Sequence, residues 1–126
     1  DVGDQVLRKL AKHLQRITGG GHASRYGGEE FAIIFPDKSI AEVSHHLELL
    51  RENIASSGFS VRKKNRPKKL PKNKMRDNTT HKEIKVTVSI GVAERNRMNR
   101  KTEEVQKAAD TALYKAKKTG RNKICY

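Results

Sequence analysis

The sequence contains no tryptophan and a single cysteine, Cys125, among its 126 residues. One cysteine excludes a disulfide within the chain and fits a reducing compartment. The sequence also lacks any run of 18 or more apolar residues, so we expect no membrane-spanning helix. These absences predict a cytoplasmic domain, which a larger, membrane-anchored protein can also carry.

Patterns of metal ligands are scarce as well. The five histidines show no metal-ligand spacing, and His45 and His46 are adjacent, so they face different directions on a helix. No Asp-x-Asp pair occurs anywhere in the chain. The histidines therefore give no indication of a metal site.

Acidic residues are few: 14 against 28 lysines and arginines, a net charge of +14. Residues 62–85 carry eleven of the bases and two acids, so most of the excess is local. We expect residues 62–83 to form a solvated basic loop, with an electrostatic contact to anionic lipid, nucleic acid or an acidic partner as the alternative. No aromatic residue lies between Val61 and Tyr114 to stack on bases, so nucleic acid is not the expected partner.

The remaining segments show helical and strand patterns in turn. Ser39 and Glu42 form a capping box at the start of one helix, and Gly27-Gly28 is expected to make the tight turn of a hairpin. Helices are expected at 4–18, 40–54 and 102–119. Strands are expected at 22–26, 30–35, 59–61, 83–93 and 122–126. This order predicts a single α+β domain over 1–126, with helices packed on an antiparallel-rich sheet.

The segment with the clearest chemistry is Arg25-Tyr-Gly-Gly-Glu-Glu-Phe31. A Gly-Gly turn lets a phosphate approach backbone N–H groups, because no side chain blocks it. Two neighbouring acids can hold Mg²⁺, which prefers a few carboxylates together with phosphate oxygens. Many hairpins carry such a turn and exposed acids without any function, so the motif alone leaves both interpretations open.

This heptapeptide resembles the signature of the GGDEF family of diguanylate cyclases, in its GGEEF form. Three more segments are similar to the family in the right order: the opening Asp1-Val-Gly-Asp-Gln-Val-Leu7, the strand Val86-Thr-Val-Ser-Ile-Gly-Val-Ala93, and the closing helix and turn at 109–122. The resemblance covers nearly the whole chain apart from the basic loop.

The resemblance implies a palm-like, ferredoxin-like fold of the nucleotide-cyclase type. It also implies an enzyme that condenses two GTP molecules into cyclic di-GMP and releases pyrophosphate, acting as a homodimer with Mg²⁺ or Mn²⁺. A sensor domain would accompany the domain in the parent protein. The alternative is a non-catalytic GGDEF module that binds GTP or cyclic di-GMP and signals to a partner domain.

Roles follow for residues at matching positions of the signature. Glu29 and Glu30 take the places of the two motif acids that bind metal, and Glu29 would also help to deprotonate the attacking 3′-hydroxyl. Gly27 and Gly28 would line the phosphates. All four residues therefore belong to the predicted catalytic hairpin.

Three further residues match positions that bind the nucleotide. Asp4 would accept bonds from the N1–H and amine of guanine, although a first-turn acid is also favoured by the helix dipole alone. Lys117 and Arg121 would reach the triphosphate, although their spacing is also common in solvated helices. Leu113 and Tyr114, on the same helix, are expected in the core.

Besides the basic loop at 62–83, the sequence departs from the family in two respects. The family's first strand, with its metal-binding aspartate, has no counterpart here, so we expect this chain alone to be inactive and its sheet to lack a central strand. Thr18 and Gly21 stand where many relatives have the Arg and Asp of a product-inhibition site. Neither side chain can hold cyclic di-GMP as that pair does, so we expect no tight inhibition.

Overall fold

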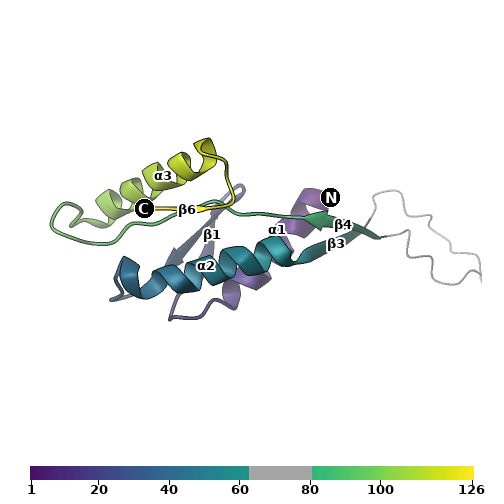
Figure 1. Cartoon of the computed structure of the whole chain (residues 1–126), viewed down its shortest axis with the longest axis horizontal. Helices are drawn as coiled ribbons and strands as arrows, with labels where there is room; N and C mark the ends of the chain where they lie inside the picture. The colour runs from purple at the N-terminus through teal and green to yellow at the C-terminus, as the bar shows by residue number, and fades with distance from the viewer. Residues whose placement is uncertain (63–80) are drawn as a thin grey trace, which may run out of the picture.

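A computed structural model describes residues 1–62 and 81–126 of the chain (Figure 1). The elements of these two ranges are α1 (Val2–Gln15), β1 (His22–Gly27), β2 (Glu30–Ile34), α2 (Ile40–Ser56), β3 (Gly58–Arg62), β4 (His81–Lys85), β5 (Ile90–Gly91), α3 (Thr102–Lys118) and β6 (Ile124–Cys125). This order confirms the predicted α+β class and the position of each predicted helix to within a few residues.

The core lies where α1, α2 and β3 meet. Its buried residues are Leu10 and Leu14 of α1, Leu50 and Ile54 of α2, and Phe59 of β3. The apolar face of α2 is buried as its spacing predicts, and the capping box is present, with Glu42 N–H donating to Ser39 Oγ at 3.2 Å. Periodicity and capping therefore placed both helices correctly.

Within residues 1–62 and 81–126, the strands form three separate two-stranded sheets instead of one continuous sheet. The pair β1–β2 is antiparallel, β3–β4 is antiparallel, and β5–β6 is parallel. The strand predicted at 83–93 is divided, because residues 86–89 belong to no ladder in the described part of the chain. Their alternation is real, since Val86 and Val88 pack half-buried against the core, but a strand also needs a neighbour to bond.

Strand β2 also has one edge with no hydrogen-bonded strand beside it among the described residues. Within the described residues β2 bonds only to β1, while its Phe31 and Ile33 pack on the same core as Val86 and Val88. This arrangement agrees with the expectation that a central strand is missing among the described elements.

The predicted loop at 62–83 is partly strand at its two ends. In the β3–β4 ladder Arg62 pairs with His81, and Ser60 pairs with Glu83. The remainder of the predicted loop, residues 63–80, lies outside the described residues.

Helix α3 packs on β5 and β6, and Figure 1 shows these strands between α3 and α2. Its small residues Ala112 and Ala116 are buried. The prediction that Tyr114 belongs to the core was wrong, because its side chain is 60% exposed and lies beneath the Lys118 ammonium, 4.8 Å from the ring centroid. Tyr114 is two residues from each buried alanine, about 200° around the helix at 3.6 residues per turn, so it lies on the outer face. No helix in the described ranges is long and apolar enough to cross a membrane.

Candidate functional site

The turn of the β1–β2 hairpin lies one residue later than predicted. Arg25 pairs with Phe31, but Gly27 pairs with Glu30, so the register shifts between them and Tyr26 is the extra residue of a bulge. The turn is therefore Gly28-Glu29 and not Gly27-Gly28. Of the two glycines only Gly28 has a positive φ, 50°, because Gly27 has become a strand residue.

This turn exposes the two acids at the open end of the hairpin. Glu29 lies in the turn itself and Glu30 begins β2, and both are exposed. A Cβ added to Gly27 or Gly28 would meet nothing within 4 Å. The turn backbone is thus accessible to a ligand on the side of Gly27 and Gly28 where a Cβ would otherwise project.

Arg25 holds the turn from inside the signature. Its guanidinium donates two hydrogen bonds to the Gly28 carbonyl, from Nε at 3.2 Å and from Nη2 at 2.7 Å. A planar guanidinium gripping one carbonyl fixes the orientation of the neighbouring peptide groups. Arg25 therefore shapes the turn that carries Glu29, a role that the sequence did not reveal.

Helix α3 contacts the hairpin at two points. The Lys117 ammonium lies 3.7 Å from Glu30 Oε1, and Gln106 Nε2 donates to the Tyr26 hydroxyl. The ion pair brings together two of the predicted site residues from opposite ends of the sequence. Gln106 was not predicted, because no spacing relates it to the signature.

Arg121 lies just beyond α3 in a left-handed conformation. Its φ is 60° and that of Asn122 is 46°, and the Arg121 N–H donates to the Ala116 carbonyl at 2.9 Å. Arg51 of α2 braces this turn, with its Nη1 donating to Asn122 Oδ1 at 2.8 Å. Strained backbone of this kind persists where surrounding contacts hold it, and it is common at functional sites.

Arg51 also binds Glu48, its neighbour on α2. The Glu48 carboxylate accepts from Arg51 Nε at 3.1 Å, and this hydrogen bond lowers the pKa of Glu48, although partial burial opposes the shift. Because the folded-state pKa is lowered, the stabilisation is present above the unfolded pKa of about 4.3 and is lost as pH falls through the folded value.

We expect Glu48→Gln to lower the free energy of unfolding at pH about 7 by about 0.5 kcal/mol, a small effect because the pair is half-exposed and screened. At pH about 3 the difference from the parent should be smaller, because protonation of the Glu48 carboxylate weakens its pairing with Arg51, whereas the glutamine does not titrate. Urea unfolding at the two pH values measures both differences, with Glu103→Gln as a control for removing an exposed acid. A loss of the same size at both pH values would contradict the assignment.

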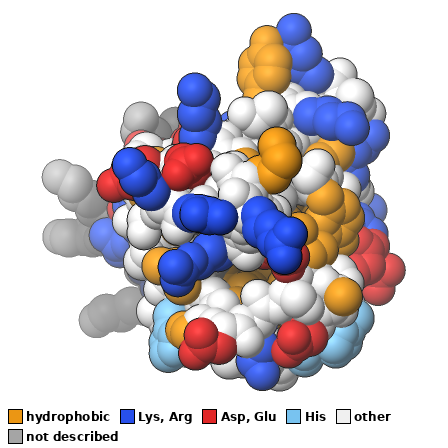
Figure 2. Space-filling view, turned by 90° about the vertical axis from the view of Figure 1, so that its left-hand side faces the viewer, with side chains coloured by type: hydrophobic (Ala, Val, Ile, Leu, Met, Phe, Trp, Pro, Cys, Tyr) orange, Lys and Arg blue, Asp and Glu red, His pale blue; other side chains and the backbone are white. Residues whose placement is uncertain are grey.

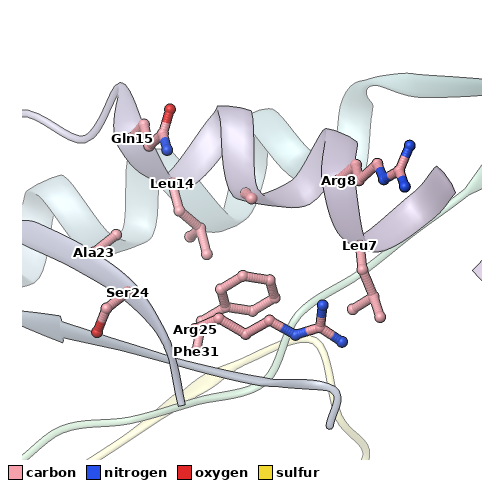
Figure 3. Close-up of a pocket in the computed structure, with 9 residues that line it drawn as sticks. Leu7, Arg8, Leu14, Gln15, Ala23, Ser24, Arg25 and Phe31 are labelled. Carbon is pink, nitrogen blue, oxygen red and sulfur yellow. The ribbon is translucent and has the colours of Figure 1, made fainter. Parts of the chain in front are cut away.

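Asp4 lies on the first turn of α1 beside a pocket. The pocket has a cavity volume of about 220 Å³ and lies between α1 and the hairpin; Figure 3 shows Leu7, Leu14, Arg25 and Phe31 facing one another across it. Asp4 Oδ2 pairs with Arg8, another lining residue, at 3.1 Å. This pair is exposed, so exchanging it for another partner costs at most about 1 kcal/mol.

The structure thus brings some of the predicted site residues together. The turn joins Gly27, Gly28, Glu29 and Glu30, and Lys117 reaches the last of them. Asp4 lies on α1, outside the hairpin, and is paired there with Arg8. Arg121 is held by the turn that follows α3. Within residues 1–62 and 81–126, no group of three or more His, Cys, Asp or Glu is placed to hold a metal ion.

Comparison with known families accounts for this arrangement. The family model described as "Diguanylate cyclase, GGDEF domain" matches residues 1–73 and 68–123. The chain belongs to the GGDEF family. It therefore shares a fold in which the signature hairpin carries the motif acids, here Glu29 and Glu30.

Individual curated proteins are similar to nearly the whole chain. The response regulator PleD of Caulobacter vibrioides is 32% identical over 125 residues, which cover 98% of this chain and 24% of that protein. The diguanylate cyclase VdcA of Vibrio cholerae is 34% identical over 124 residues, covering 97% of this chain and 32% of that protein. The chain thus spans about a quarter to a third of the length of these curated relatives.

Solved GGDEF structures are similar as well. The GGDEF domain of DgcB from Caulobacter crescentus, solved in complex with c-di-GMP, is 34% identical with a TM-score of 0.74, covering 98% of this chain and 63% of that one. The active GGEEF domain of a diguanylate cyclase from Vibrio cholerae is 28% identical with a TM-score of 0.68, covering 99% of this chain and 68% of that one. The predicted palm-like architecture is confirmed by these likenesses.

Proposed function

We propose that this chain is the catalytic domain of a diguanylate cyclase, which joins two GTP molecules into cyclic di-GMP. The observation that carries the proposal is the open end of the signature hairpin, where Glu29 and Glu30 are exposed and Lys117 lies 3.7 Å from Glu30. Carboxylates for a metal and an ammonium for a phosphate are thus side by side. The relatives described as diguanylate cyclases support the same chemistry.

The donor set of the hairpin fits a magnesium ion. Two adjacent carboxylates and an open backbone turn match the preference of Mg²⁺ for one or two protein carboxylates together with substrate phosphates. Held by Glu29 and Glu30, Mg²⁺ or Mn²⁺ would supply Lewis-acid stabilisation of charge on the phosphate. The backbone N–H groups at Gly27 and Gly28 would lie against the phosphate oxygens.

The remaining residues orient the nucleotide. Asp4 would turn from Arg8 to the guanine edge, with the base entering the pocket beside Leu7, which shares a helix face with Asp4 at spacing i, i+3. A carboxylate accepts from both N1–H and the amine of guanine, which adenine does not offer. Lys117 and Arg121 would neutralise the triphosphate.

Two such domains would meet to complete the reaction, each presenting one GTP. The 3′-hydroxyl of one GTP attacks the α-phosphorus of the other, the bond from that phosphorus to the bridging oxygen breaks, and pyrophosphate leaves. Glu29 would accept the proton of the hydroxyl. Repeating the step in the opposite direction closes the ring and releases a second pyrophosphate, which is why we propose a homodimer for catalysis.

We further propose that the chain alone is inactive. Among the described residues, the free edge of β2 and the unpaired segment 86–89 leave the hairpin without support on one side. The test is GTP turnover with Mg²⁺, comparing this chain with the same chain extended at its N-terminus by the family's opening strand. Cyclic di-GMP from the extended chain only is the expected result. GTP binding without product from either chain would replace this proposal by the non-catalytic signalling module.

The same assay addresses product inhibition. The Thr18 hydroxyl is bonded to His46 Nδ1 at 2.6 Å, and a Cβ on Gly21 would lie 2.7 Å from the Phe35 ring and 2.9 Å from Ile33. Neither position offers a cation or carboxylate to cyclic di-GMP, so added product should leave turnover unchanged in the micromolar range. Calorimetric titration of the extended chain provides the direct measurement. Saturable micromolar binding that Thr18→Ala weakens would contradict this expectation.

A further inference from the structure

The segment that joins β5 to α3 contains a short basic loop, residues 95–101. Arg95, Arg97, Arg100 and Lys101 give it four positive charges, with no acid among its seven residues. Met98 stands in the middle and is 84% exposed, the most exposed of the large hydrophobic residues in the described part of the chain. An exposed apolar side chain with basic residues before and after it in the loop requires a physical explanation.

The exposure of Met98 is imposed by a hydrogen-bonded turn. Asn96 Oδ1 accepts from Met98 N–H at 2.9 Å and from Asn99 N–H at 2.8 Å, and Asn96 N–H donates to the Asn99 carbonyl at 3.1 Å. At the far end, Lys101 N–H donates to Glu104 Oε1 at the start of α3. The loop therefore has a defined shape that holds Met98 in solvent.

The loop also lies away from the candidate catalytic residues. It precedes α3, whereas Lys117 lies near the end of that helix, about 22 Å along the axis at 1.5 Å per residue. The loop forms one end of the molecule in Figure 1, and Figure 2 shows Lys and Arg side chains gathered in the middle of that end. A partner bound there would leave the Lys117–Glu30 contact free, while Gln106, near the start of α3, connects that end of the helix to Tyr26 of the hairpin.

We propose that residues 95–101 form a docking surface for an anionic membrane, with Met98 entering the interface and the arginines binding lipid phosphates. Guanidinium groups pair with phosphate in a bidentate manner, and clusters of basic residues are attracted to anionic leaflets. This inference goes beyond the proposed function and does not depend on it.

The composition of the loop favours lipid over other anionic partners. A stable protein interface takes about 20 to 30 residues from each side. The loop supplies seven. Single-stranded nucleic acid is usually held by aromatic stacking, and the loop has no aromatic residue. A single apolar tip with cations around it suits a headgroup layer, where the tip leaves water while the cations remain hydrated.

Because the chain contains no tryptophan, one introduced at the tip reports on the loop alone. With Met98→Trp, vesicles containing about a third phosphatidylserine should shift the fluorescence to the blue, and brominated lipid should quench it. Pure phosphatidylcholine should produce neither effect. The control is Leu49→Trp, at a 51% exposed position on α2, whose emission should remain unchanged.

The charge requirement is tested with a matched pair of variants. Replacing Arg97 and Arg100 by Gln should weaken partitioning into anionic vesicles roughly 25-fold, at about a fivefold loss for each charge. Lys9→Gln with Lys12→Gln removes the same charge from α1 and should weaken partitioning by less than the loop variant does.

Three results would overturn the proposal. The first is equal weakening of partitioning by the two pairs of variants. The second is sedimentation of the Met98→Trp protein with anionic vesicles while its fluorescence shows neither the blue shift nor the quenching, because the protein would then bind through another surface. The third is tighter binding of the loop to duplex DNA than to vesicles at equal salt.

Discussion

Glu29→Gln in the N-terminally extended chain is expected to reduce cyclic di-GMP formation by about a hundredfold to a thousandfold. The substitution keeps the size of the side chain at the tip of the turn but removes its charge. A neutral amide neither accepts the proton of the 3′-hydroxyl nor holds a hard cation as a carboxylate does. The turn itself should survive, because Arg25 grips the Gly28 carbonyl and not Glu29.

The measurement is initial rate of product formation at saturating GTP and a series of Mg²⁺ concentrations. A fall in kcat that high Mg²⁺ does not restore would assign proton transfer to Glu29, whereas partial recovery would assign metal binding. Glu103→Gln, an exposed acid on α3, is the matched control and should retain full activity. A rate for Glu29→Gln within a factor of about three of the parent would remove this residue from the catalytic set.

The helices were predictable because their signals are local. The apolar positions of α2 and its capping box all fall within 16 consecutive residues, from Ser39 to Ile54, and both features are present in the structure. Leu10 and Leu14, which the apolar spacing of α1 predicts to share a face, are likewise buried. Burial of one helix face requires only a core somewhere beneath it, so the pattern alone locates the helix.

The sheets were less predictable because pairing depends on distant strands. Residues 83–93 alternate as a strand should, yet 86–89 remain unpaired for lack of a neighbour in the described part of the chain. The turn of the hairpin was placed one residue early, since two adjacent glycines indicate a turn but do not reveal a bulge at Tyr26. Alternation reports which side of a strand is buried, not which strand lies next to it.

The candidate catalytic and binding residues were predicted from the motif, whereas the residues that position them were not. Glu30 and Lys117 were both predicted, and their contact connects positions 87 apart in the chain. Arg25 and Gln106 were missed, because a guanidinium that braces a turn and an amide that reaches a tyrosine carry no characteristic spacing. Such contacts depend on the arrangement of α3 against the hairpin, which only the folded chain provides.

That arrangement rests on one glycine. A Cβ on Gly91 of β5 would overlap the Ala109 carbonyl oxygen and the backbone nitrogen of Leu113. These are backbone atoms of α3, so relief requires the whole helix to move and not one side chain to turn. Displacing α3 would also carry Lys117 away from Glu30.

We therefore expect Gly91→Ala to destabilise the domain by about 3 kcal/mol or more, at the upper end of the effects of overpacking. For a domain of this size the melting temperature should fall by about 10 °C. The measurement is thermal and urea unfolding of the extended chain, and Gly58→Ala is the control. Gly58 is also a strand glycine, but there the three atoms nearest to the added methyl all belong to the Glu83 side chain, which can rotate away. Equal midpoints for the two variants would mean that α3 can withdraw from β5 without loss, and the helix would then not fix the position of Lys117.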